Sequence, residues 1–336
     1  MDAEELQRRR DERARARRRR QTRRRIGAGA ALALVAVAVI VAIASATGSG
    51  TGGKPAAKRA ARPRTTTRAT TTSHHLVGRH TRGESTAAVL GPATGVKGTD
   101  SVPVLMYHVI AAPPAGAPFP GLYVQPQEFA AQMQALKQAG WHAVTLDQLQ
   151  AYWNKGAKLP AGKPIVLTFD NGYHSQYAEA LPVLRKLGWV ADENIQLSGL
   201  PPSQGGLTAP EVKAMVDAGW ELDTQGISHA DLITLDGAQL QYQIDTARKT
   251  IQRRYGVPVN WFCYPSGHYD TTVIDAVRKA GYIGSTTVIP GWAGPASDPY
   301  RLPRLRVLGG TSPSALLEQI ATYRTAVAPP GSYGGA

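Results

Sequence analysis

Short apolar runs alternate with amphipathic stretches over the last two thirds of the chain, and this alternation limits most strongly what it can fold into. The runs 102–107 and 164–169 have the length and apolar character of buried strands. Between them, Phe129, Met133 and Leu136 recur at the spacing of one helical face. Seven or eight such β-α units predict a parallel sheet covered by helices.

An α/β barrel is the natural closure of that many units. A doubly wound open sheet is the alternative. It is disfavoured because no Gly-rich nucleotide-binding loop follows the first apolar run. We therefore expect residues 101–336 to form a barrel, with functional side chains at the carboxyl ends of its strands.

Polar residues follow several of the predicted strands. Asp170 ends the run 165–169, which should be buried on both sides, so a carboxylate there has little structural justification and indicates function. The other polar or aromatic candidates at strand ends are Tyr107, His108, Asn171, Asp223, Gln225, His229 and the stretch 264–267.

Three segments carry a resemblance to a known family. TFDNG (168–172), GWELDTQGISHADL (219–232) and FCYPSGHYD (262–270) resemble the first three motifs of the polysaccharide deacetylases, which are also called the NodB homology domain or carbohydrate esterase family 4. VLMYH (104–108) and LPRLRV (302–307) resemble the exported subgroup that acts on N-acetylglucosamine polymers.

The resemblance implies a distorted (β/α)7 barrel over 101–336, with its motif core in 160–310. It also implies removal of acetyl groups from sugars with the help of a divalent metal, usually zinc, held by one Asp and two His. The implied ligand of the protein is an N-acetylated glycan of the cell envelope.

Roles carry over residue by residue. By resemblance Asp170 is the general base, His229 is the second histidine ligand, and the Ser266 amide is an oxyanion donor. Tyr264 occupies the corresponding position of motif three in the subgroup whose motif reads FxYPxG.

Three further residues are predicted to contact the sugar: Tyr107, His108 and Trp292. Tyr107 and Trp292 are candidates for stacking surfaces. The general-acid histidine of the last family motif has no counterpart in 302–307.

Two positions depart from the family pattern, because Asn171 stands where the metal-binding Asp is expected and Gln225 where the first His is expected. Both offer only neutral carbonyl oxygens, whereas zinc prefers imidazole, thiolate or carboxylate. Asp223, His174 and His268 are possible replacement ligands.

Three functions therefore remain open. The first is an active deacetylase with a weak or repaired metal site, or with metal-free hydrolysis by Asp170. The second is a catalytically silent glycan-binding protein. The third, a glycosidase, needs two acids flanking one bond, and only Asp170 is clearly positioned for that role.

The composition of the first hundred residues predicts a membrane anchor followed by a flexible linker to the barrel. Residues 1–25 form an Arg-rich leader, and the uncharged stretch 26–47 is long enough to cross a bilayer. The positive-inside rule puts the leader in the cytoplasm and the barrel outside. A cleaved signal ending near 44–46 is the alternative, which would make the protein secreted. Residues 48–100 have the composition of a disordered linker.

The charge pattern argues against nucleic acid as a partner. The formal charge is +14, yet residues 101–336 contain seventeen basic and seventeen acidic side chains, so the excess lies wholly in the leader and linker. The one cysteine, Cys263, excludes an intramolecular disulfide and is expected to be a buried small residue.

Overall fold

The computed structural model describes residues 93–198, 205–324 and 328–335. The predicted leader and the predicted membrane helix 26–47 lie outside these residues, as does most of the predicted linker. None of the helices in the described ranges is both long enough and apolar enough to cross a membrane.

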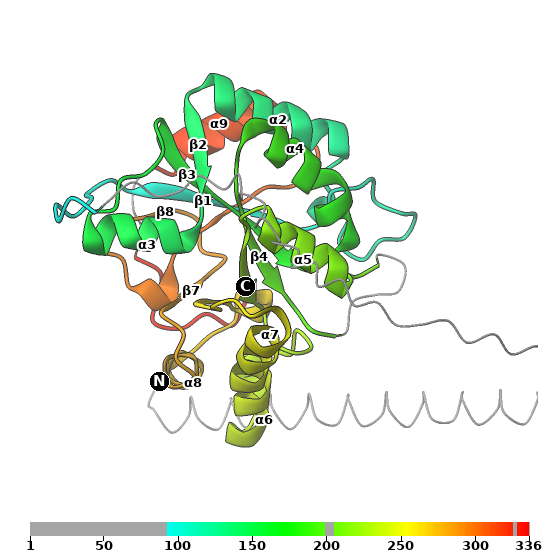
Figure 1. Ribbon diagram of the computed structural model, residues 1–336. Coiled ribbons are helices and arrows are strands. Elements are labelled where there is room, and N and C mark those ends of the chain that lie inside the picture. The colour runs from blue at the N-terminus through cyan, green and yellow to red at the C-terminus, as the bar shows by residue number, and fades with distance from the viewer. Residues whose placement is uncertain (1–92, 199–204, 325–327, 336) are drawn as a thin grey trace, which may run out of the picture. The chain divides into compact units, whose positions relative to one another are not determined.

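Nine strands of the described chain form one sheet (Figure 1). They are β1 (Val102–Tyr107), β2 (Trp141–Val144), β3 (Lys163–Asn171), β4 (Asp192–Ile195), β5 (Glu221–Thr224), β6 (Trp261–Cys263), β7 (Gly284–Thr286), β8 (Trp292–Ala293) and β9 (Leu305–Arg306). The main path runs β7-β6-β5-β4-β3-β1-β8, while β2 pairs with β3 and β9 pairs with β1.

All pairings are parallel except that of β8 with β1. The sheet curls back on itself, because the segment 302–306 links two strands that lie far apart in this order: Leu302 bridges to Thr286 of β7, and β9 pairs in parallel with β1. The predicted parallel α/β barrel is confirmed in this distorted form.

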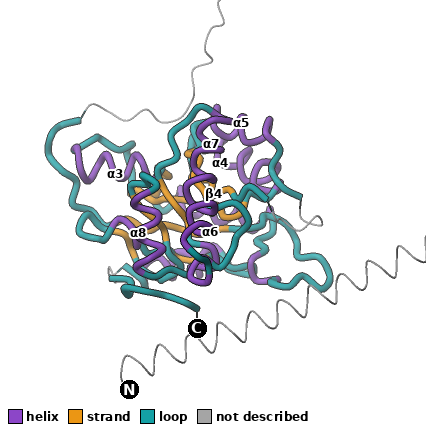
Figure 2. Tube along the Cα trace, turned by 90° about the horizontal axis from the view of Figure 1, so that it is seen from below, coloured by secondary structure: helices purple, strands orange, loops and turns teal. Residues whose placement is uncertain are grey.

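Helices surround the strands, as the view in Figure 2 shows. The α-helices are α2 (Pro126–Gln138), α3 (Leu146–Lys155), α4 (Leu181–Leu187), α5 (Ala209–Asp217), α6 (Gly237–Gln241), α7 (Ala247–Tyr255), α8 (Thr271–Lys279) and α9 (Pro313–Thr322). Shorter helical turns are η1 (Pro120–Leu122), η2 (Gln176–Ala180), η4 (Leu232–Thr234), η5 (Tyr242–Thr246), η6 (Pro265–Gly267) and η7 (Pro299–Arg301).

Local sequence explains where these helices begin and end. Thr145 caps α3 through a capping box with Gln148, and the Asp270 side chain caps α8 by accepting from Val273 N. Glycines in the left-handed region follow α3 and α7, at Gly156 and Gly256, where a residue without Cβ is favoured.

The two faces of each strand differ in chemistry. On β3, Leu167 and Phe169 pack into the apolar layer beneath the helices, together with Phe129 of α2. The alternate residues Thr168 and Asp170 point into the barrel, where both hydrogen-bond to one buried arginine. The barrel interior is therefore polar near the carboxyl ends of the strands.

Candidate functional site

Asp170, the penultimate residue of β3, is 1% exposed and lies at the centre of a buried hydrogen-bond network. Arg304 Nη1 donates to its Oδ1 at 2.8 Å, and Arg304 Nη2 donates to its Oδ2 at 2.9 Å. Asn194 Nδ2 donates to Oδ1 at 2.9 Å, and Cys263 Sγ lies 3.5 Å from Oδ2. Both oxygens of the predicted base are thus occupied by protein donors.

This network fixes the charge of Asp170. Burial by itself raises the pKa of the carboxyl, but the guanidinium of Arg304, the neighbouring His108 and the donors on Arg304 and Asn194 outweigh burial and lower the pKa to about 2. Asp170 is ionised throughout the physiological range. Its low pKa makes it a weak proton acceptor.

His108 directly follows β1 and faces the same carboxylate, with Nε2 3.9 Å from Asp170 Oδ2. Burial lowers the pKa of His108 to about 4, although the negative charge of Asp170 opposes the shift. The imidazole is therefore neutral at pH 7. The sequence predicted His108 as a sugar contact and identified no histidine for proton transfer, whereas the structure puts this imidazole beside the predicted base.

Three residues at or beyond the carboxyl ends of strands have a strained backbone. Asn171, His229 and Ser266 have φ values of 83°, 53° and 57°, and no other non-glycine residue of the described chain has a positive φ. Each lies just beyond the carboxyl end of a strand or at its last residue: β3, β5 and β6, respectively. Such conformations cost about 1–3 kcal/mol each and tend to persist at functional sites.

The three predicted metal positions do not form a zinc donor set. Asn171 turns its Nδ2 to Gln196 Oε1 at 2.9 Å, and Gln225 Oε1 is buried without a hydrogen-bond partner. His229 supplies the one imidazole, whose pKa is lowered by burial against the opposing charge of Asp170. Two carboxamides and one imidazole do not match the ligands that zinc prefers, so we derive no catalytic step through a metal here.

The predicted replacement ligands do not repair this set. His174 Nδ1 pairs with Glu211 Oε1 at 3.0 Å, and His268 Nδ1 lies 3.0 Å from Asp231 Oδ1. Asp223 points into the barrel and accepts a hydrogen bond from the backbone N–H of Trp261 at 2.9 Å.

The structure contradicts the prediction that Tyr107 and Trp292 are stacking surfaces for a sugar. Tyr107 is fully buried on the outward face of β1 and donates its hydroxyl to Gln132 Oε1 at 2.9 Å. Trp292 is 7% exposed and pairs with Pro103 at the start of β1, the end opposite His108. Neither ring can stack on a sugar at the carboxyl edge.

Tyr264 and Ser266 were predicted as site residues from the same motif, but they lie in different surroundings. The Tyr264 side chain is buried, stacks on Tyr269 and donates its hydroxyl to Tyr300 O at 3.0 Å, so this ring belongs to the outer core and not to the site. Ser266 is exposed at the carboxyl edge, as expected for an oxyanion donor position.

Comparison with known proteins agrees with this geometry. The polysaccharide deacetylase family profile matches residues 157–284. A Bacillus subtilis protein named "Putative polysaccharide deacetylase YxkH" is 31% identical over 215 residues, which are 64% of this chain and 74% of that protein. The family match spans both β3 with Asp170 and β5 with its following loop.

Solved structures show the same fold. The Streptococcus pyogenes deacetylase PplD, solved with acetate, is 27% identical with a TM-score of 0.60 and covers 66% of this chain and 99% of its own. A polysaccharide deacetylase from Bacillus cereus is 28% identical with a TM-score of 0.58, covering 66% and 69%. The curled parallel sheet and these matches are those of the polysaccharide deacetylase class. The chain belongs to the polysaccharide deacetylase family.

Proposed function

We propose that this protein recognises the N-acetyl groups of a cell-envelope glycan at the carboxyl edge of its sheet and hydrolyses them. The observation that carries the proposal is the convergence of Asp170, His108 and His229 with the strained residues Asn171 and Ser266. A cavity of about 240 Å³ is lined by Gly172, the residue after Asn171, and by Gln196, the hydrogen-bond partner of Asn171, and it would admit an acetamido group.

The reaction adds water to the acetyl carbonyl and releases acetate and a free amine, so one proton must pass from the water to the leaving nitrogen. The two imidazoles, His108 and His229, can change their protonation here, because Asp170 is held ionised by Arg304, and of the two only His108 lies within 4 Å of that carboxylate. We assign the proton transfer to His108 and the stabilisation of its charged form to Asp170. We assign the oxyanion donor to the amide of Ser266.

The low pKa values of both groups make a slow enzyme the natural expectation, since proton transfer is most efficient when the pKa lies near the working pH. Members of the family generally use a divalent metal. In this chain Asn171 and Gln225 occupy two of the predicted ligand positions, and we propose that this degenerate set binds zinc weakly.

The same carboxamides favour a second candidate, a catalytically silent glycan-binding protein. The Asn171 amide is already hydrogen-bonded to Gln196, and both oxygens of Asp170 are engaged. Such a protein would keep the sugar site and lack turnover. We further propose that residues 26–47 anchor the barrel outside the cell membrane, with secretion after cleavage as the alternative.

The deciding experiment measures acetate released from N-acetylglucosamine oligomers by the purified full-length chain, in added zinc and in chelator. The matched variant is Asp170→Asn, with folding verified by circular dichroism. Release that requires Asp170 supports the enzyme, and chelator sensitivity would show that metal contributes. No release under either condition, together with retention on an N-acetylated glycan matrix, would establish the binding protein.

A further inference from the structure

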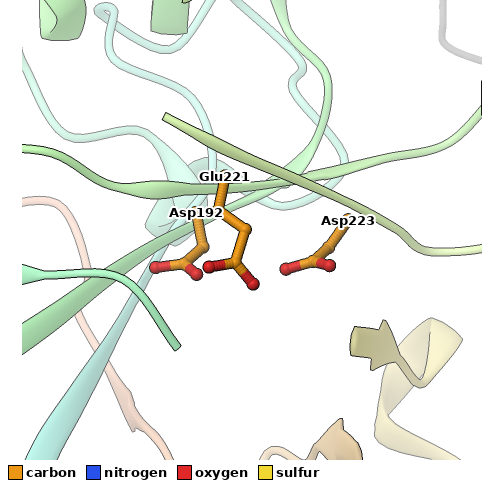
Figure 3. Close-up of side chains that lie close together, drawn as sticks. All are labelled: Asp192, Glu221 and Asp223. Carbon is orange, nitrogen blue, oxygen red and sulfur yellow. The ribbon is translucent and has the colours of Figure 1, made fainter. Parts of the chain in front are cut away.

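Three acidic side chains lie together inside the barrel, away from the site described above. Asp192 of β4 and Glu221 and Asp223 of β5 offer oxygens that all lie within 4.8 Å of one another. Figure 3 shows the three carboxylates in a row, with that of Glu221 between the other two. Asp192 is the register partner of Thr168 on β3 and of Glu221 on β5. Thr168 precedes Asp170 by two residues, so the cluster begins one inward-facing position nearer the amino end of the strands.

One oxygen of each carboxylate is already held by the backbone. Asp192 Oδ1 accepts from Leu146 N, Glu221 Oε2 from Asp147 N and Asp223 Oδ1 from Trp261 N, each at 2.9 Å. These donors come from the start of α3 and the start of β6. The three carboxylates are therefore fixed in position by separate parts of the fold.

The other oxygen of each carboxylate has no partner. Asp192 Oδ2, Glu221 Oε1 and Asp223 Oδ2 are buried and accept no hydrogen bond. Within the described ranges no lysine, arginine or histidine forms an ion pair with any of the three. Burial raises the pKa of all three carboxyl groups, and buried charges without a counter-charge are costly, so the cluster is neutralised either by bound protons or by a cation.

A fourth oxygen, from a neutral residue, completes the group. Asn194 is fully buried and its Oδ1 has no partner. Its Nδ2 is bound to Asp170 of β3, so Oδ1, on the other side of the amide, is turned toward β5, where Asp223 is the register partner.

Protons shared among the carboxyl groups would satisfy these oxygens one by one, since a protonated carboxyl beside Asn194 can donate to its Oδ1. A cation would satisfy all four oxygens at once. A donor set made only of carboxylate and carbonyl oxygens suits a hard divalent ion such as Ca²⁺, Mg²⁺ or Mn²⁺ and is unfavourable for softer metals.

We propose that Asp192, Glu221, Asp223 and Asn194 form a structural site for one hard divalent cation inside the barrel. The ion joins β4 to β5. It also fixes the carboxamide of Asn194, whose other end holds Asp170 Oδ1, so the site supports the orientation of Asp170 from beneath. This site is separate from the Asn171, Gln225 and His229 positions and does not depend on the proposed reaction.

The test uses the purified full-length chain, stripped with chelator and then dialysed against Ca²⁺, Mg²⁺ or Mn²⁺ singly. Elemental analysis should find about one ion per chain for at least one of these cations, and the thermal midpoint of unfolding should rise with its concentration. Asp223→Asn and Glu221→Gln, which keep an acceptor for the backbone N–H, should lose both the ion and the rise.

Two matched variants identify the location of the ion. Asp217→Asn changes an exposed acid on α5, and His229→Ala removes the imidazole at the carboxyl edge; both should retain the ion. An ion lost in His229→Ala but retained in Asp223→Asn would belong to the other site and overturn the proposal. The proposal would also be overturned if the wild-type chain held none of these cations and if neither millimolar cation nor chelator changed its thermal midpoint of unfolding. That result would mean that shared protons neutralise the cluster. The wild-type measurements decide the matter even if the interior variants fail to fold.

Discussion

Arg304 and Asp170 form a bidentate ion pair inside the barrel, with nitrogen–oxygen distances of 2.8 and 2.9 Å and both side chains at most 2% exposed. The pair joins the segment that closes the sheet to the end of β3. It also determines the chemistry of the site, since the guanidinium keeps Asp170 ionised despite its burial.

Removing the arginine should be severely destabilising. Arg304→Leu leaves the Asp170 carboxylate buried without its partner, and we expect a loss of about 3–5 kcal/mol in the free energy of unfolding, measured by urea denaturation. Arg306→Leu, at an exposed position two residues on, should change stability by no more than about 0.5 kcal/mol. The double variant Arg304→Leu/Asp170→Leu should recover much of the loss; a double variant as unstable as the single one would contradict this account.

The sequence identified one member of this pair and overlooked the other. Asp170 stood out because a carboxylate ended an apolar strand, which is a local signal. Arg304 lies 134 residues away, and nothing local distinguishes it from Arg306, because the contact arises only when the sheet curls and brings 302–306 beside β1.

The same reasoning explains the remaining successes and errors at the site. The β-α alternation indicated where strands end, so the strand-end placements of Asp170, His229 and Ser266 were predictable. Tyr107 and Trp292 were assigned to the sugar because aromatic rings suit that task, but which face of a strand a residue occupies depends on what covers it. Here helices cover the outer face, and both rings are buried there.

His108 should make the protein sensitive to acid. Its folded-state pKa of about 4 lies below the ordinary value of 6.5, so the unfolded chain binds a proton more readily between these two pH values. The free energy of unfolding should therefore fall as pH drops from 6.5 to 4, by roughly 3 kcal/mol from this residue. Urea denaturation at several pH values measures the slope, and His108→Gln should flatten it. An unchanged slope in the variant would assign the acid sensitivity elsewhere.

Two glycines with the same left-handed conformation should respond differently to alanine. Gly256 has φ of 67° and open space where a Cβ would lie, so Gly256→Ala should cost only the backbone strain of about 1 kcal/mol. Gly267 has φ of 74°, and a Cβ there would lie 2.4 Å from Val288 Cγ2. Gly267→Ala should cost clearly more in urea denaturation and displace the adjacent Ser266, lowering glycan binding. Equal losses of stability in the two variants would contradict this prediction, because they would show that the loop around Gly267 rearranges to accommodate a Cβ at no extra cost.

Restoring the family's ligand types should create a zinc site at the carboxyl edge. Asn171→Asp with Gln225→His would supply the carboxylate and the second imidazole beside His229, and we expect zinc affinity to rise by at least about 100-fold. The Gln196 amide now accepts from Asn171, and by rotating it can donate to the carboxylate introduced at this position, at the loss of its hydrogen bond to Ser198 O.

Isothermal titration with zinc measures the gain in affinity, and acetate release from N-acetylglucosamine oligomers tests whether it brings activity that chelator removes. The single variant Asn171→Asp should gain much less, because it leaves the carboxamide of Gln225 in place of an imidazole. A double variant that folds but binds zinc no better than the wild type would mean that these positions do not converge on one metal.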